Sequence, residues 1–152
     1  METLEIITNS ARETKKVARL LAAEIVRLQT NSKRALVIAL RGDLGGGKTT
    51  FTQGFARGLG IRQNILSPTF VMMKAYKIQG LKYKRLIHID VYRLEKTRGI
   101  FVLGWKELVS NDTTIILVEW AERLGGLLPK ERIDIEFEFI DEKIRKISIK
   151  KL

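Results

Sequence analysis

The sequence predicts a single α/β domain over residues 1–152, in which helices flank a sheet of mixed strand direction and an antiparallel hairpin closes the chain. Three observations support this class. The runs ALVIAL at 35–40 and TIILVE at 114–119 are continuously apolar, as strands buried on both faces of a sheet are. Stretches with apolar residues at helical spacing lie among the strand candidates. The tail alternates apolar and polar residues in RIDIEFEF and again in RKISIKKL, which is typical of a hairpin with one wet face.

The N-terminal part predicts a short strand followed by a long helix. LEIIT at 4–8 is the strand candidate, and Ser10 with Glu13 forms an S-x-x-E capping box ahead of the helix. In ARETKKVARLLAAEIVRL at 11–28, apolar residues recur at helical spacing and predict one buried face. The residues expected on that face are Val17, Leu20, Leu21, Ile25 and Leu28.

The central part predicts a strand, a glycine-rich loop and a second helix in direct succession. ALVIAL is followed by RGDLGGGK at 41–48, and the residues from Thr49 to about Leu59 suit a helix that Gly60 would end as a C-terminal cap. Further on, FVMMKAY and YKRLIHID flank Gln79-Gly80 and predict two strands joined by a turn. The two continuously apolar strands are expected to be central, with the chemistry at their C-terminal ends.

Composition excludes several kinds of site. The chain has no cysteine, which excludes disulfides and thiol nucleophiles, and its one histidine, His88, excludes a histidine-rich metal centre. A lone histidine is more often a structural hydrogen-bonding residue than a general base, so His88 is not expected to be catalytic. The N-terminus lacks the apolar segment of a secretory signal and the longest apolar run is too short for a membrane span, so we expect a soluble, cytoplasmic protein. The net charge of +11 attracts polyanions but does not by itself indicate nucleic-acid binding.

The glycine-rich loop carries the clearest chemical signal. Residues 42–49 read GDLGGGKT and satisfy the P-loop pattern G-x-x-x-x-G-K-[ST] between a strand and a helix. The glycines let backbone N–H groups wrap a phosphate, Lys48 places a positive charge on the β- and γ-phosphates, and the Thr49 hydroxyl is a ligand for Mg²⁺. The fold class is therefore P-loop NTPase-like, and the expected cofactors are ATP and Mg²⁺.

Two acidic residues stand at strand ends where a P-loop protein needs a carboxylate to orient Mg²⁺. Glu119 closes TIILVE and Asp90 closes LIHID. On position alone each is a candidate, and the occurrence of an acid at both strand ends favours a function in the site.

Five blocks in this order resemble the TsaE family, the ATPase component of the bacterial pathway that makes threonylcarbamoyladenosine in tRNA. They are GDLGGGKTTFTQGFARGLGI, ILSPTFVMMKAY, LIHIDVYRL, LGWKEL and ILVEWAERL. The resemblance implies a P-loop protein that hydrolyses ATP with Mg²⁺ in complex with the TsaB and TsaD proteins. That activity would serve formation of the modification at adenosine 37 of ANN-decoding tRNAs. Threonylcarbamoyl transfer itself would belong to TsaD, and contact with tRNA would be indirect, through the complex.

The resemblance also implies roles for individual residues. Lys48, Asp90 and Glu119 would be catalytic, with Thr49 and Glu119 on the metal and Asp90 on the attacking water or the metal's outer shell. The block SPTF resembles a switch segment whose Thr69 reaches the γ-phosphate or Mg²⁺. The residues expected to bind the nucleotide are Gly42, Asp43, Leu44, Gly45, Gly46, Gly47, Lys48, Thr49, Thr50 and Thr69.

Two departures from the family pattern are small. Gly46 stands where the family usually has alanine, which would loosen the loop slightly. Ala121 replaces a common proline after Glu119-Trp120, which makes the turn there less rigid.

Two alternatives use the same loop. A small-molecule kinase would need an arginine-bearing lid, and the chain after Glu119 shows no helical pattern for one. An RNA-binding module with an ATP site is favoured by cations around one predicted turn with tyrosines among them. Those cations are Lys74, Lys77, Lys82, Lys84 and Arg85. A solvated hairpin with protective lysines explains the same residues.

Overall fold

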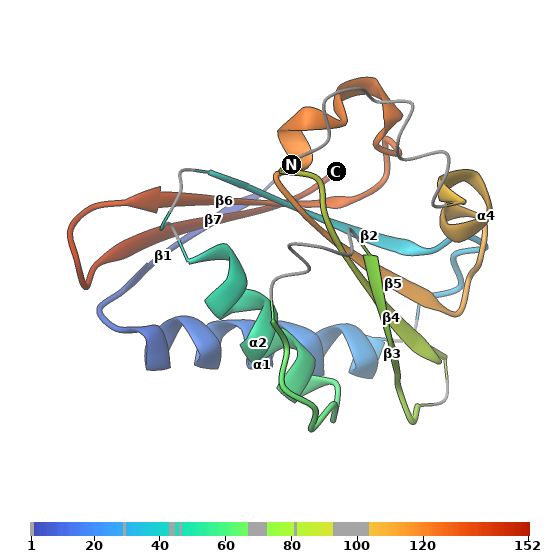
Figure 1. The fold of residues 1–152 in the computed structure, drawn as a ribbon, viewed down its shortest axis with the longest axis horizontal. Coiled ribbons are helices and arrows are strands. Elements are labelled where there is room, and N and C mark those ends of the chain that lie inside the picture. The colour runs from blue at the N-terminus through green and yellow to red at the C-terminus, as the bar shows by residue number, and fades with distance from the viewer. Residues whose placement is uncertain are drawn as a thin grey trace.

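The fold is a seven-stranded mixed sheet with helices on both faces (Figure 1). The computed structural model describes residues 2–28, 30–42, 45, 47–66, 73–80, 82–92 and 104–152. The strands are β1 (Thr3–Thr8), β2 (Leu36–Gly42), β3 (Met73–Lys77), β4 (Arg85–Asp90), β5 (Thr114–Glu119), β6 (Ile133–Phe139) and β7 (Arg145–Lys151). The helices are α1 (Ala11–Leu28), α2 (Lys48–Gly58) and α4 (Trp105–Val109), with 3₁₀ turns η1 (Ala121–Arg123) and η2 (Gly125–Leu127).

The strand order is β1-β7-β6-β2-β5-β4-β3. The four central strands β6, β2, β5 and β4 run parallel, and β1, β7 and β3 add to the two sides in antiparallel pairs. The expected mixed α/β sheet, its two central buried strands and both hairpins are confirmed. Because β2, β4 and β5 are parallel, their C-terminal ends meet at one edge of the sheet, and both predicted acids stand there.

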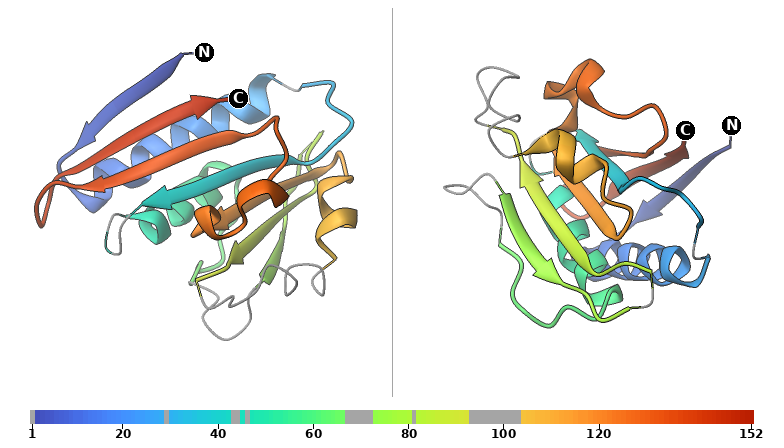
Figure 2. Two further views of the ribbon diagram at one scale, coloured as in Figure 1. Left: turned by 90° about the horizontal axis from the view of Figure 1, so that it is seen from above. Right: turned by 90° about the vertical axis from the view of Figure 1, so that its right-hand side faces the viewer.

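The core has two parts, one on each face of the sheet. Helices α1 and α2 lie side by side on one face, whereas α4 and the 3₁₀ turns cover the other (Figures 1 and 2). Strand β5 supplies both, because Ile115 and Leu117 face α1 and α2 while Ile116 and Val118 face α4. Every residue of β5 is buried, which explains why its sequence shows no alternation.

Helix α1 begins where the sequence predicts, with one change in its cap. Ser10 Oγ accepts a hydrogen bond from the backbone N–H of Glu13 at 3.1 Å, as in a capping box. The Glu13 carboxylate, however, accepts its backbone bond from Asn9 at 3.2 Å, one residue before the expected Ser10. The cap therefore also fixes the chain entering the helix.

The predicted buried face of α1 is wrong in part. Leu20 and Leu28 are 60% and 57% exposed, whereas the buried residues are Thr14, Ala18, Ala22 and Ile25. The reason is the close approach of α2: a Cβ built on Gly54 would lie 2.4 Å from the carbonyl oxygen of Lys15. Large side chains do not fit where the two helix backbones nearly touch, so small residues form the contact face.

The remaining sequence-predicted elements are found with small shifts. Helix α2 ends at Gly58, and Gly60 has a φ of 82°, the left-handed conformation expected of a glycine after a helix. In the described part of the chain, no helix has the length and apolar character needed to cross a membrane.

Candidate nucleotide-binding site

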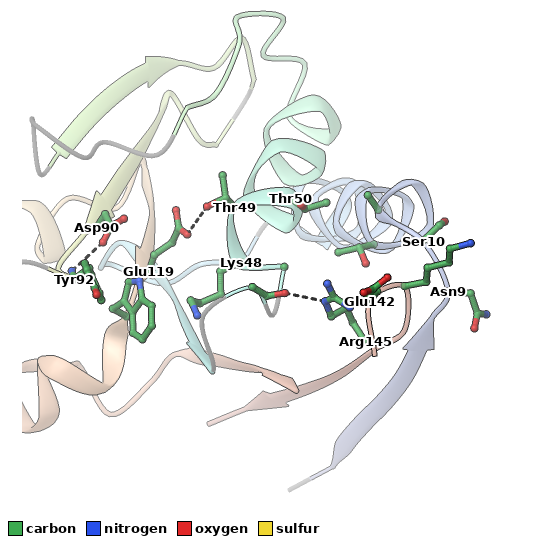
Figure 3. Close-up of a pocket in the computed structure, with 16 residues that line it drawn as sticks. Asn9, Ser10, Lys48, Thr49, Thr50, Asp90, Tyr92, Glu119, Glu142 and Arg145 are labelled. Carbon is green, nitrogen blue, oxygen red and sulfur yellow. Dashed lines mark hydrogen bonds between the residues drawn. The ribbon is translucent and has the colours of Figure 1, made fainter. Parts of the chain in front are cut away.

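A cavity of about 820 Å³ lies at the C-terminal edge of the parallel strands (Figure 3). At one end it is lined by Asp90 and Glu119, from the ends of β4 and β5. At the other end it is lined by Ser10, before α1, and Arg145, at the start of β7. Lys48 lies between the two ends, so the cavity runs along the first turn of α2.

The glycines shape the entry to α2. Gly42 has a φ of 130°, and a Cβ built there would lie 2.1 Å from the carbonyl oxygen of Phe137, so no side chain fits at the end of β2. Gly47 has a φ of 101° and is the N-cap of α2. The N–H groups in the first turn of a helix point toward its N-terminus, which here lines the cavity. Gly47 has no side chain to accept their hydrogen bonds, so an anion would be stabilised at this place.

Lys48 is the first residue of this helix. Its side chain is buried, with 5% of the residue exposed, and its Nζ donates a hydrogen bond to the carbonyl oxygen of Gly42 at 2.6 Å. The same Nζ lies 4.0 Å from the centroid of the Trp120 ring. The ammonium group is therefore held over the loop by a carbonyl and an aromatic face.

The carboxylate of Glu119 has a partner on each oxygen. Thr49 Oγ1 donates to Oε1 at 3.0 Å, and His88 Nε2 lies 2.5 Å from Oε2. Both Glu119 and His88 are buried, at 2% and 0% exposed. The pair of a threonine hydroxyl and a carboxylate, both oxygen donors, has the chemistry that Mg²⁺ prefers, since Mg²⁺ is held by one or two carboxylates together with phosphate oxygens and water.

Asp90 lies beside Glu119 because the two strands that end in these acids are neighbours. In the parallel pairing of β4 and β5, Asp90 is the direct partner of Glu119. Its Oδ1 accepts the backbone N–H of Tyr92 at 2.9 Å, which fixes the carboxylate through the turn that follows it. The two acids therefore line the same end of the cavity (Figure 3).

Trp120 has a strained backbone at the end of β5. Its φ of 61° and ψ of 37° are left-handed, and within the described ranges it is the only non-glycine residue with positive φ. Such a conformation costs on the order of 1–3 kcal/mol and is frequent at functional sites. The Trp120 ring packs on Tyr92 at a centroid distance of 4.9 Å, so two aromatic rings form the wall beside Lys48.

Arg145 links the C-terminal hairpin to the glycine loop. Its Nε donates to the carbonyl oxygen of Gly45 at 3.0 Å, across a sequence separation of 100 residues (Figure 3). Its guanidinium also packs over the Phe139 ring at 4.5 Å. The turn between β6 and β7 therefore forms a wall of the cavity and holds part of the loop.

The structure brings most of the sequence-predicted site residues together. Gly45, Gly47, Lys48, Thr49, Thr50, Asp90 and Glu119 line the one cavity, and Gly42 ends the strand that leads into it. Asp43, Leu44, Gly46 and Thr69 lie outside the described residues. The functional roles of all these residues stay predictions.

The contacts that His88 and Arg145 make with the site were not predicted from the sequence. His88 was expected to be structural, although its place two residues before Asp90 put both on one strand face. Its contact with Glu119 depends on the pairing of β4 with β5, for which the sequence carries no local signal. Arg145 reaches the loop from the far end of the chain, and alternation in the hairpin gave no indication of that contact.

The basic turn around β3 and β4 is largely occupied by contacts within the chain. Lys82 Nζ donates to the carbonyl oxygen of Ser32 at 3.0 Å, Lys84 Nζ donates to that of Gly80, and Arg85 Nε donates to the hydroxyl of Thr114 at 2.9 Å. These contacts favour the interpretation of this turn as a protected hairpin over an RNA-binding surface.

Comparison with known proteins agrees with the geometry. The profile of the family described as "Threonylcarbamoyl adenosine biosynthesis protein TsaE" matches residues 8–147. The chain is 40% identical over 148 residues to the tRNA threonylcarbamoyladenosine biosynthesis protein TsaE of Bacillus subtilis (strain 168), covering 97% of this chain and 85% of the relative. It is 36% identical over 120 residues to the protein of that name from Haemophilus influenzae, covering 79% of this chain and 73% of the relative.

Comparison of the fold with solved structures points to the same family. A crystal structure of YdiB from Bacillus subtilis superposes with a TM-score of 0.76 at 36% sequence identity, covering 99% of this chain and 86% of that one. The match over nearly the whole chain, together with the relatives above, shows that the chain belongs to the TsaE family of tRNA threonylcarbamoyladenosine biosynthesis proteins.

Proposed function

We propose that this chain binds ATP with Mg²⁺ in the cavity at the start of α2 and hydrolyses it to ADP and phosphate. The observation that carries the proposal is that Lys48, Thr49 and Glu119 line the same cavity at the start of α2. Thr49 Oγ1 and Glu119 Oε1 are 3.0 Å apart, and Lys48 precedes Thr49 at the N-terminus of α2. A cation, a hydroxyl and a carboxylate at a helix start are the parts that phosphoryl chemistry on a P-loop requires.

In this proposal each side chain has one task. Lys48 leaves the carbonyl oxygen of Gly42 and binds the β- and γ-phosphates. Thr49 and Glu119 hold Mg²⁺, which neutralises charge on the phosphates when it is bound. Asp90, fixed by its bond to the backbone of Tyr92, orients the attacking water or a water on the metal.

The far end of the cavity would receive the nucleoside. It extends past Gly45 and Gly47 to Ser10 and Arg145, so a triphosphate bound at Lys48 would leave the nucleoside there. The walls at that end are polar and come from the α1 cap and the β6–β7 turn. This placement makes the hairpin part of the nucleotide site.

The turnover is proposed to serve threonylcarbamoyladenosine formation in tRNA. The relatives are named for that pathway, and the family resemblance implies TsaB and TsaD as partners. In this role the chain is an ATPase that acts with those partners, and tRNA is contacted through the complex. Partner-dependent turnover predicts slow hydrolysis by the isolated chain.

The test is phosphate release from ATP by the purified protein, alone and then with TsaB, TsaD and tRNA. We expect a low basal rate that rises strongly with TsaB and TsaD and that requires Mg²⁺. The matched control is Lys48→Ala, which should show no stimulated release. Absence of ATP binding in the presence of Mg²⁺, or a rate that the partners do not change, would refute the proposal.

The same assay separates hydrolysis from phosphoryl transfer. With γ-labelled ATP, a hydrolase releases the label as free phosphate, whereas a small-molecule kinase leaves it on a metabolite. Between Glu119 and β6 the chain forms only the single 3₁₀ turns η1 and η2, and no helical lid is formed by this described segment. We therefore expect the label in free phosphate.

A further inference from the structure

The buried contact between His88 and Glu119 has no part in the function proposed so far. His88 is the only histidine of the sequence, and none of its surface is exposed. Its Nε2 lies 2.5 Å from Oε2 of Glu119, while Thr49 donates to the other carboxylate oxygen. The carboxylate is therefore held between an imidazole and a hydroxyl.

The parallel pairing of β4 with β5 produces this contact. Asp90 is paired with Glu119, and His88, two residues earlier, is paired with Leu117. Residues two apart on a strand share a face, so His88, Asp90 and Glu119 all point to the side of the sheet that carries α2. His88 does not line the cavity. It contacts Glu119 from within the buried part of β4.

The hydrogen-bond partners assign the tautomer of His88. An ionised carboxylate only accepts hydrogen bonds, so Nε2 must carry the proton that is shared with Oε2. His88 Nδ1 is buried and, among the residues that the structure describes, has no hydrogen-bond partner. A second N–H at that position would be buried without an acceptor, which is costly, so the neutral Nε2–H form fits the site.

We propose that His88 is a positioning residue for the cation site: it binds Oε2 of Glu119 so that Oε1 is directed at Thr49 and at the Mg²⁺. The inference rests on the proposed function, since it concerns the metal of the ATP complex. A neutral donor fixes the rotamer of the carboxylate without cancelling its negative charge. Groups that orient a metal ligand in this way typically contribute a factor of about 10 to 100 in metal affinity or activity.

Two amide substitutions separate the position of the donor from its polarity. In His88→Gln the side-chain amide nitrogen falls near the place of Nε2 and can still donate to Glu119. In His88→Asn the amide falls near the place of Nδ1 and cannot reach. Both variants bury one amide, so a difference between them reports the contact and not the loss of a ring.

Ile87→Val is the matched control for a weakened strand. Ile87 neighbours His88 on β4, is 1% exposed and faces the opposite side of the sheet. Removing its methyl group costs about 0.5–1.5 kcal/mol of stability and leaves Glu119 untouched. It shows how far a general loss of stability alters nucleotide binding.

The measurement is the dissociation constant of a non-hydrolysable ATP analogue, adenylyl imidodiphosphate, by calorimetry in Mg²⁺ and again in EDTA. The constant in EDTA divided by the constant in Mg²⁺ measures how much magnesium strengthens binding. We expect His88→Asn to lower this ratio by about 10-fold or more while its constant in EDTA stays within about 3-fold of wild type. His88→Gln and Ile87→Val should keep the wild-type ratio.

The outcomes distinguish the two proposals. A wild-type ratio that survives in His88→Asn overturns the positioning role and leaves the ATPase proposal standing. Equal losses in Mg²⁺ and in EDTA, or equal losses in Asn and Gln variants, show a structural role and also overturn it. If the wild-type protein binds the analogue equally well with and without Mg²⁺, the proposed function fails, and this inference with it.

A variant that does not fold is recognised by thermal unfolding of each protein before calorimetry. Should His88→Asn be unfolded, His88→Leu takes its place, because leucine is apolar and has no hydrogen-bond donor for Glu119. A titration of Mg²⁺ at fixed analogue should then show a midpoint shifted upward by about 10-fold or more in His88→Leu, and a wild-type midpoint in His88→Gln. An unshifted midpoint in His88→Leu would overturn the proposal.

Discussion

The ammonium group of Lys48 lies 4.0 Å from the centroid of the Trp120 ring. Because Lys48 is buried, this contact replaces part of the hydration that its charge loses, and such contacts contribute about 0.5–2 kcal/mol. A triphosphate that draws Lys48 away from Gly42 must also alter its contact with the ring. In the proposed nucleotide complex, the environment of the Trp120 ring would therefore change.

We expect the fluorescence of Trp120 to report nucleotide binding for this reason. Titration of ATP with Mg²⁺ should change the emission of the wild-type protein and leave that of Trp120→Phe unchanged. The second tryptophan, Trp105, donates its indole N–H to the carbonyl oxygen of Leu127 at 3.1 Å and does not line the cavity. A signal that persists in Trp120→Phe would contradict this assignment.

Substitutions of Lys48 and of Glu119 should impair the proposed ATP site in different ways. Lys48→Ala removes a charge-assisted hydrogen bond, worth about 1.5–3 kcal/mol, and should weaken ATP binding by roughly 10- to 100-fold. Glu119→Gln keeps an oxygen for Thr49 but loses the charge directed at the cation. It should bind ATP in EDTA as the wild type does and lower partner-stimulated turnover by roughly 100-fold or more.

Calorimetry and phosphate release on the same preparations check this pair. Matched unfolding temperatures in the two variants would show that both folds are intact. Loss of ATP binding in EDTA by Glu119→Gln would contradict its proposed role, because Mg²⁺ is absent in that measurement.

The turn between β6 and β7 predicts a local dependence of stability on pH. Asp141 Oδ1 accepts the backbone N–H groups of Lys143 and Ile144, each at 2.8 Å, and these bonds lower the pKa of the Asp141 carboxyl. A carboxyl whose pKa is lowered by folding stabilises the protein above its unfolded pKa of about 3.9. That contribution is lost as the pH falls through the lowered folded value.

Urea unfolding of wild type, Asp141→Asn and Asp141→Ala at neutral pH and near pH 3 checks this. Asparagine keeps an oxygen acceptor without charge, so the gap between wild type and Asp141→Asn should shrink as the pH falls. Asp141→Ala, which has no acceptor, should have the lowest midpoint at neutral pH. A gap between wild type and Asp141→Asn that is independent of pH would show that the charge does not contribute.

Most of the fold could be predicted because its signals are local. Continuous apolar runs predicted the buried strands β2 and β5, and strict alternation predicted the hairpin of β6 and β7. The pairing of β1 with β7 could not be predicted, since it joins residues such as Thr3 and Lys150 from opposite ends of the chain. Strand order is set by packing over the whole sheet, so no single segment of the sequence carries a signal for it.

The residues of the site likewise fall into those that a local sequence pattern predicts and those that only long-range contacts bring together. The glycine loop and its lysine are contiguous, so their spacing predicts a phosphate site. Asp90 and Glu119 were predicted from their places at strand ends. His88 and Arg145 act through contacts made by strand pairing and by the hairpin turn, and residue type alone favoured a structural role for the histidine.

The contact between α1 and α2 gives the sharpest prediction for stability. A Cβ on Gly54 would lie 2.4 Å from the carbonyl oxygen of Lys15, and one on Gly58 would lie 2.6 Å from that of Arg19. Because the obstacle is backbone, Gly54→Ala and Gly58→Ala should each destabilise the fold by about 1–3 kcal/mol, despite the better helix propensity of alanine. Gly126→Ala is the control, since a Cβ there meets nothing within 4 Å. Chemical unfolding should show lower midpoints for the first two variants and a wild-type midpoint for the third. A stabilised Gly54→Ala would mean that the helices can separate at little cost, which the alanines buried on α1 argue against.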